Sequence, residues 1–163
     1  ESPLTIKLDA DAQGRIKTEA YLNAWLMRNL KEGKLRELIG EYHDFLNFVP
    51  TSFNTVMDVF LTHVTVIDGT EILHKYTCVE LKTGLCTLAD IRQIVKYEHW
   101  LVRKLGQGDA EMVQSMVIAH DFQEEAVEYV RKRISVEERT VHLIQYRLAL
   151  EPADVVLQEL DLS

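Results

Sequence analysis

Val56-Met57-Asp58-Val59-Phe60-Leu61 and Tyr76-Thr77-Cys78-Val79-Glu80-Leu81-Lys82 are two apolar stretches that decide the fold. Both contain many β-branched and aromatic residues, which favour strands. Asp68-Gly69 lies between them, and this dipeptide is a strong signal for a two-residue hairpin turn. The sequence therefore predicts two antiparallel strands, over residues 56–66 and 70–82.

Three charged residues lie inside these strands, where a charge is costly unless it is paired or binds a ligand. Glu80 and Lys82 are two residues apart, so both side chains point to one face of their strand. Asp58 lies ten residues before Asp68, and Glu80 lies eleven residues after Gly69. A two-residue hairpin then places Asp58 nearly opposite Glu80. One bulge, or a longer loop, puts all three charged groups on the same face.

Two carboxylates in this arrangement suit Mg²⁺ or Mn²⁺, which prefer oxygen ligands, and the Leu81 carbonyl could add a third oxygen. A bound metal activates water and neutralises charge on a phosphate. Lys82 could orient that water or stabilise the developing charge. The pattern thus predicts a phosphodiester hydrolase with Asp58 and Glu80 as metal ligands. The alternative is an exposed Glu–Lys ion pair, which contributes little to stability.

Turn and cap signals divide the rest of the chain into helices and further strands. We expect an α/β fold with a central mixed sheet flanked by helices. Residues 42–53 are ambiguous, and 45–49 fit a short strand or a turn of helix. The acidic segment 151–163 is expected to be loosely ordered or to pack on a neighbour. The remaining expected elements are strands over 4–8, 112–119 and 140–150, and helices over 19–32, 34–39, 88–105 and 123–132.

The longest expected helix begins after Thr87, a favourable N-cap residue, and ends before Gly106. Gln93 and Tyr97 are four residues apart, so they share one face of this helix. The two side chains could hydrogen-bond a phosphate, a base or Lys82. Equally, Tyr97 could be packed in the core and Gln93 could belong to a local hydrogen-bond network.

The order of these charged and polar residues along the chain resembles that of the PD-(D/E)xK nuclease-like superfamily. The resemblance is carried by Asp58, by Glu80-Leu81-Lys82, and by Gln93 and Tyr97, which are similar to the Gln-xxx-Tyr motif of the RecB-like and NucS-like branch. It covers roughly residues 17–120. Glu19, in the first turn of the first helix, matches the place of a glutamate that often joins the site.

The resemblance implies a restriction-endonuclease-like αβββαβ core and Mg²⁺-dependent cleavage of DNA. We therefore expect one nuclease-like domain over residues 1–163, with its core at about 17–150. Met57, rather than proline, precedes Asp58, and the hairpin is long. The alternative is an inactive nuclease-fold module with a structural or interaction role. Such a module could dimerise through its C-terminal strand and tail, or adjoin a further domain of a longer chain.

Composition excludes several other classes of protein. The 163 residues carry a net charge of −8, which argues against a broad basic surface for nucleic acid but not against a nuclease with an acidic site. The six histidines show no metal-binding spacing, and no Gly-rich phosphate loop is present. No run of residues is long and apolar enough for a membrane span. The two cysteines indicate a reducing compartment, and we expect a cytoplasmic location.

Overall fold

The computed structural model describes residues 9–150 and 153–163 of the chain. From its first helix to its fifth strand, the principal elements follow the expected αβββαβ order. The helices are α1 (Glu19–Lys31), α2 (Arg36–Ile39), α3 (Leu88–Lys104), the 3-10 turn η1 (Ala110–Met112) and α4 (Glu124–Glu137). The strands are β1 (Asp44–Pro50), β2 (Val56–Ile67), β3 (Thr70–Leu81), β4 (Leu85–Cys86), β5 (Val113–Ala119), β6 (Asp121–Phe122), β7 (His142–Leu150) and β8 (Ala153–Glu159).

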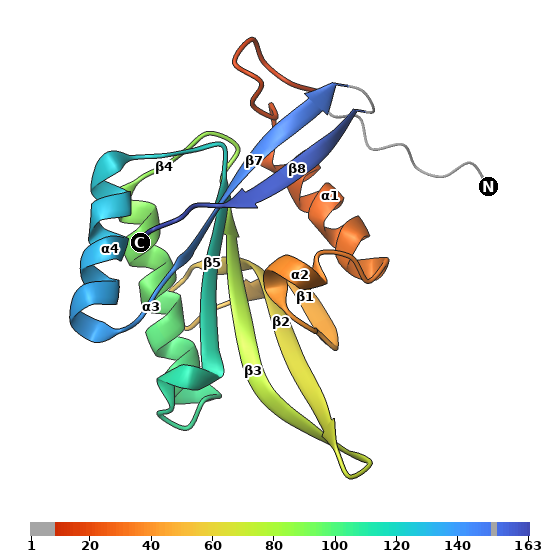
Figure 1. Ribbon diagram of the computed structural model, residues 1–163, viewed down its shortest axis with the longest axis vertical. Coiled ribbons are helices and arrows are strands. Elements are labelled where there is room, and N and C mark those ends of the chain that lie inside the picture. The colour runs from red at the N-terminus through yellow and green to blue at the C-terminus, as the bar shows by residue number, and fades with distance from the viewer. Residues whose placement is uncertain (1–8, 151–152) are drawn as a thin grey trace.

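Six strands form one twisted sheet in the order β1-β2-β3-β5-β7-β8. The β3–β5 and β5–β7 pairs are parallel, and the other three pairs are antiparallel. Helices α3 and α4 cover one face of this sheet, and α1 and α2 lie on the other (Figure 1). The prediction of an α/β fold with a central mixed sheet flanked by helices is confirmed.

Each face of the sheet has its own hydrophobic core because side chains alternate along a strand. Phe60 and Cys78 point toward the α3 and α4 layer, where they pack against residues such as Ile94. Val59 and Val79 point toward the α1 layer, where they pack against residues such as Leu26. The distal half of the β2–β3 hairpin extends beyond both helical layers (Figure 1).

Both edge strands of the sheet lie in segments whose structure the sequence left open or did not predict. The ambiguous segment 42–53 contains a strand, β1, which pairs with β2 along the edge. The C-terminal segment was expected to be a loose or intermolecularly packed tail, but it forms β8, which pairs with β7 within the chain. Val155 accounts for this difference, since its buried side chain adds to the core under α1. The strand expected over residues 4–8 lies outside the described residues.

The predicted starts of α1 and α3 are correct, and α3 has the cap that Thr87 predicts, whereas the helices expected over 34–39 and 123–132 begin at Arg36 and Glu124. The Thr87 hydroxyl accepts from the Asp90 backbone N–H, and Asp90 accepts in return from the Thr87 N–H, which makes a full capping box at α3. Thr18 occupies the N-cap position of α1, where its side chain makes no capping bond. No α-helix within 9–150 and 153–163 combines the length and the apolar character that crossing a bilayer requires.

Candidate active site

The register of β2 and β3 brings Asp58 and Glu80 together. The hairpin closes with Ile67 opposite Thr70, and its register shifts beside His63, where His74 is the extra residue on β3. Beyond this bulge Val59 pairs with Val79, so the next residues outward, Asp58 and Glu80, are level with each other. The expectation that a bulged two-residue hairpin aligns these two carboxylates on one face is confirmed.

Asp58 is buried near the start of β2 and joins that strand to the end of β3. Its Oδ2 accepts a hydrogen bond of 2.8 Å from the Leu81 backbone N–H. Burial raises the pKa of the Asp58 carboxyl, and it outweighs the Leu81 bond and the Lys82 charge, which both act to lower it. Asp58 is therefore held in a fixed place by β3, in surroundings that disfavour an isolated negative charge.

Glu80 is the acid of the site whose pKa is raised the most. Only 8% of the residue is exposed, and its Oε2 atom is buried with no hydrogen-bond partner among the described residues. Burial first, and then the negative charge of Asp58, raise the pKa of the Glu80 carboxyl to about 8. A buried carboxylate oxygen without a partner is costly, and a bound cation would remove that cost.

Glu19 lies at the rim of the same group of charges. It is in the first turn of α1 and is exposed, yet partial desolvation and the nearby Asp58 charge raise the pKa of its carboxyl. Lys82 acts in the opposite direction on this pKa. The first helix therefore brings a third carboxylate to the same end of the sheet, as the resemblance implies.

Lys82 follows β3 directly and lies on the same side as Glu80. Its Nζ atom makes an ion pair of 3.2 Å with Asp90 Oδ1, and the lysine side chain is 32% exposed. Burial alone would lower the pKa of this amine, but Asp90, Glu80 and Glu19 together raise it. Lys82 is thus a cation held between the acids of the site and the start of α3.

Asp90 is the residue that sequence analysis missed. Its Oδ2 accepts from the Thr87 N–H at 2.8 Å and from the Thr87 hydroxyl at 3.0 Å, while its Oδ1 faces Lys82. One carboxylate therefore caps α3 and holds the lysine. The signal in the sequence was local, because Asp90 is three residues after the N-cap Thr87, the position of a capping-box acid.

Gln93 and Tyr97 support the site without reaching its carboxylates. Gln93 donates from Nε2 to the Tyr97 hydroxyl, which donates in turn to the Val56 carbonyl at 3.4 Å. Tyr97 is fully buried and its ring stacks on Phe53, with 5.8 Å between the ring centroids. Among the described residues, these bonds tie α3 to the start of β2, two residues before Asp58.

The described residues contain no preformed group of three His, Cys, Asp or Glu side chains close enough to enclose a metal ion. The site instead consists of two aligned, buried carboxylates, Asp58 and Glu80, with Glu19 at the rim and Lys82 beside them. The described residues thus form an acidic cluster with one lysine beside it, at the end of the sheet where β3 ends.

Two solved structures share part of this fold. A repair endonuclease from Pyrococcus abyssi is 20% identical, and the match covers 67% of this chain and 42% of that one, with a TM-score of 0.47. A structure of an EndoMS-dsDNA2 complex is 16% identical, and the match covers 73% of this chain and 43% of that one, with a TM-score of 0.49. The match spans less than half the length of either structure. No protein-family model and no curated protein matches the sequence. The activity of this chain is therefore inferred from its own residues.

Proposed function

We propose that this chain is a metal-dependent nuclease domain that hydrolyses phosphodiester bonds of DNA, with Asp58 and Glu80 as metal ligands. The observation that supports it most is the buried, unpartnered Oε2 of Glu80 beside a second buried carboxylate. A structural acid in a core normally has its oxygens paired. Two adjacent acids with raised pKa values instead suit a cation that is bound between them.

The donor atoms fit Mg²⁺ or Mn²⁺. Both ions prefer oxygen ligands, and Mg²⁺ typically binds one or two protein carboxylates and keeps several waters. The Leu81 N–H points to Asp58, and an extended residue directs its N–H and C=O to the same side, so the Leu81 carbonyl is a candidate third ligand. Glu19, at the rim, is a candidate ligand through water.

A divalent cation in this place would supply a more acidic water and neutralise negative charge on a phosphate. The residues of the chain would do the rest. The Leu81 N–H orients Asp58 through Oδ2, so Oδ1 is the oxygen that would meet the cation. Lys82 places a positive charge beside the acids, where it would orient a water or stabilise charge that develops on the phosphate. Gln93 and Tyr97 hold the strand that carries Asp58.

DNA is the substrate class implied by the resemblance to the PD-(D/E)xK superfamily. The motif residues follow the order of elements that this resemblance requires. Asp58 lies on β2, Glu80-Leu81-Lys82 lies at the end of β3, and Gln93 and Tyr97 lie on α3. The membership in the NucS-like branch is part of the proposal. The acidic side chains account for part of the net negative charge, and they are the groups that the cation would neutralise.

A cleavage assay tests the proposal. The purified chain is incubated with fluorescently labelled single- and double-stranded DNA in Mg²⁺, Mn²⁺ or EDTA. Cleavage is expected with either metal and not with EDTA, and Glu80→Gln should abolish it. Glu71→Gln, on the exposed part of the same strand, is the matched control and should cleave as the wild type does.

Equal activity from the wild type and Glu80→Gln would overturn the assignment of this site. A wild-type chain that folds and does not cut any of these substrates would favour the second candidate, an inactive nuclease-fold module. The observation that favours this candidate is that Gln93 and Tyr97 bond to each other and to backbone, and not to the carboxylates, among the described residues.

A further inference from the structure

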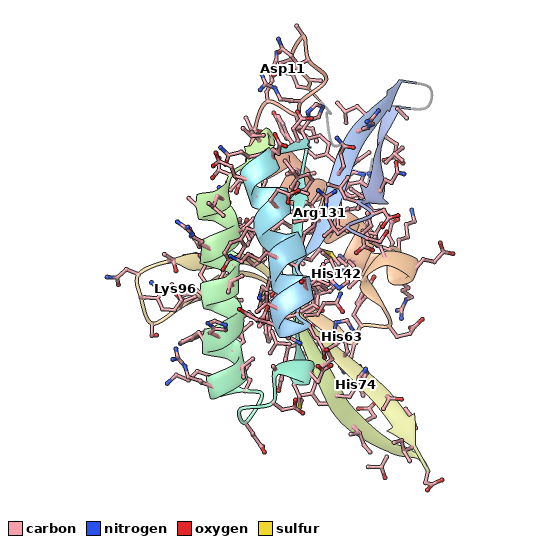
Figure 2. The ribbon with its side chains drawn as sticks, turned by 60° about the vertical axis from the view of Figure 1, so that its left-hand side comes forward. Asp11, His63, His74, Lys96, Arg131 and His142 are labelled. Atoms are coloured by element: carbon pink, nitrogen blue, oxygen red, sulfur yellow. The ribbon has the colours of Figure 1, made fainter. Side chains whose placement is uncertain are left out.

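The outer face of α3 carries a row of basic residues, which we name the α3 stripe: Arg92, Lys96, His99 and Arg103. The intervals of four, three and four residues keep all four on one side of the helix. All four are exposed. Lys96 lies on the outer side of α3, next to the loop between β1 and β2 (Figure 2). The stripe is therefore a surface feature that the core of the protein does not require.

The charges of the stripe have no acidic partner within the part of the chain that the structure describes. The ion pairs found within residues 9–150 and 153–163 include Lys82, Arg133 and Arg139 but no member of the stripe. The adjacent loop, residues 51–55, contains no charged side chain. Acids outnumber bases by 26 to 18 in this chain, so a row of bases without a paired acid is not what a random mixture of surface charges would give.

One contact holds part of the stripe in place. The Lys96 ammonium lies over the Phe53 ring, 4.4 Å from its centroid, and Phe53 stacks in turn on Tyr97. Such a cation–π contact is modest in strength, and it leaves the ammonium free to meet an anion on its other side. The position of Lys96 is thus linked, through Tyr97, to the strand that carries Asp58.

The length and direction of the stripe suit a polyanion that enters the site. Arg92 is two residues after Asp90, which holds Lys82, so the stripe begins at the end of α3 that adjoins the candidate active site, on the outer face of the helix. From Arg92 to Arg103 the helix rises about 16 Å, over which one strand of a DNA duplex carries about five phosphates. The main apolar face of α3 is buried against the sheet, so the stripe offers charge and not the exposed apolar face that binding to a membrane surface requires.

We infer that the α3 stripe binds the phosphate backbone of a nucleic acid whose scissile bond lies at Asp58 and Glu80. The second half of this inference rests on the proposed nuclease function, and the first half does not. Arg and Lys bound to phosphates release condensed counterions, so each contact adds to the salt dependence of binding. The stripe would supply affinity and direction, independent of base sequence.

The test measures binding without cleavage. Fluorescence anisotropy gives the affinity of the Glu80→Gln chain for a labelled 30-base-pair duplex over a range of KCl concentrations. In this background, the triple variant Arg92→Gln, Lys96→Gln, Arg103→Gln should bind with a weaker salt dependence. The negative slope of log K against log [KCl] should become smaller in magnitude by about 2 to 3, because each lost phosphate contact removes about 0.9. Single-stranded DNA and RNA of the same length, measured in parallel, identify the preferred form of nucleic acid.

The matched control has the same change of net charge on the opposite helical layer: Arg28→Gln, Lys31→Gln, Lys34→Gln, all exposed. It should change the slope by well under 1. The double variant Arg92→Gln, Arg103→Gln leaves the Phe53 contact intact, and it should still lose a slope of about 2. Equal slopes for the stripe variant and the control would overturn the inference. So would binding of anionic lipid vesicles that depends on the stripe while duplex binding does not.

The two proposals fail in different ways. If the wild type cuts DNA and the stripe variants keep the full salt dependence, the inference about α3 is wrong and the nuclease assignment stands. If the stripe variants lose the salt dependence but the wild type does not cut, the surface binds nucleic acid and the catalytic assignment is wrong.

Discussion

The Lys82 ammonium lies 3.2 Å from an oxygen of Asp90, and the other oxygen of the same carboxylate caps α3 through Thr87. Asp90 therefore serves both the start of α3 and Lys82, the lysine of the proposed active site. We expect Asp90 to be a positioning residue for Lys82, because a small displacement of a reacting group can cost up to about a hundredfold in rate.

Asp90→Asn should lower the cleavage rate by roughly tenfold or more, with little change in the apparent KM. The asparagine oxygen can still accept from the Thr87 N–H, so the melting temperature should change little. Thr87→Ala is the control with the opposite pattern. It should reduce the free energy of unfolding by about 1 kcal/mol and leave the rate at 25 °C unchanged. Equal kcat values for Asp90→Asn and wild type would remove Asp90 from the site.

Tyr97→Phe should destabilise the protein by about 1 kcal/mol, because the Tyr97 hydroxyl links Gln93 to the Val56 carbonyl and the phenyl ring keeps its packing on Phe53. Urea denaturation measures this change. Tyr76→Phe is the control, a buried tyrosine whose hydroxyl makes no hydrogen bond within the described residues. Tyr76→Phe should leave the free energy of unfolding nearly unchanged. A decrease as large as that of Tyr97→Phe would mean that the hydrogen bond to Val56 has no special role.

Glu98→Gln should cost about 3 to 5 kcal/mol of stability. Glu98 is buried and accepts from Arg133, Arg139 and Ser115, so these bonds outweigh its desolvation and hold the pKa of its carboxyl below the usual value. Removal of its charge leaves the buried Arg133 guanidinium with the largely exposed Glu137 carboxylate, 3.3 Å from Nε, as its remaining acidic partner among the described residues. Glu137→Gln breaks only the exposed end of the same network and should cost less than about 1 kcal/mol. Similar losses for the two variants, by thermal or urea denaturation, would contradict this account of the core.

His63 should make the protein less stable in mild acid. It is buried, with Nδ1 at 2.8 Å from the Glu41 carbonyl and Nε2 at 2.7 Å from the Thr77 hydroxyl, and burial lowers the pKa of its imidazole. Because the folded pKa is below the unfolded value of about 6.5, the neutral ring contributes full stability above that pH, and the contribution is lost as the pH falls below it. The raised pKa of Glu80 acts in the opposite direction over the same pH range, so the test compares variants and not the wild-type slope alone. In urea denaturation from pH 8 to 5, the wild type and His74→Gln should each lose more stability, or gain less, than His63→Gln does. The same slope in all three proteins would exclude His63 as its source.

The central hairpin and its site residues could be predicted because their signals are local. Asp68-Gly69 marks the turn, and counting outward from it places Asp58 near Glu80. The position of the bulge at His74 has no such signal, since it depends on how the long hairpin twists. The dual role of Asp90 also depends on tertiary structure, because a cap can be read from the sequence but the direction of its second oxygen cannot.

The buried network of Glu98 and the strand β8 were beyond sequence reasoning for the same physical reason. Glu98 is bonded to arginines 35 and 41 residues further along the chain, and an acid on a helix otherwise indicates an exposed face. In β8, buried and exposed side chains alternate as in any edge strand, with Val155 buried and Val156 exposed. The acidic composition of the segment suggested a tail instead of a strand. Long-range partners decided both outcomes.

Asp58 and Glu80 are proposed to bind one divalent cation together, and the proposed nuclease activity depends on that cation. Isothermal titration calorimetry with Mn²⁺ tests this directly and needs no substrate. The wild type and Glu71→Gln should bind Mn²⁺ at this site with equal affinity, and Asp58→Asn and Glu80→Gln should each lose that binding while they keep the folded circular dichroism spectrum. Binding of Mn²⁺ by Asp58→Asn and Glu80→Gln with the affinity of the wild type would contradict the account.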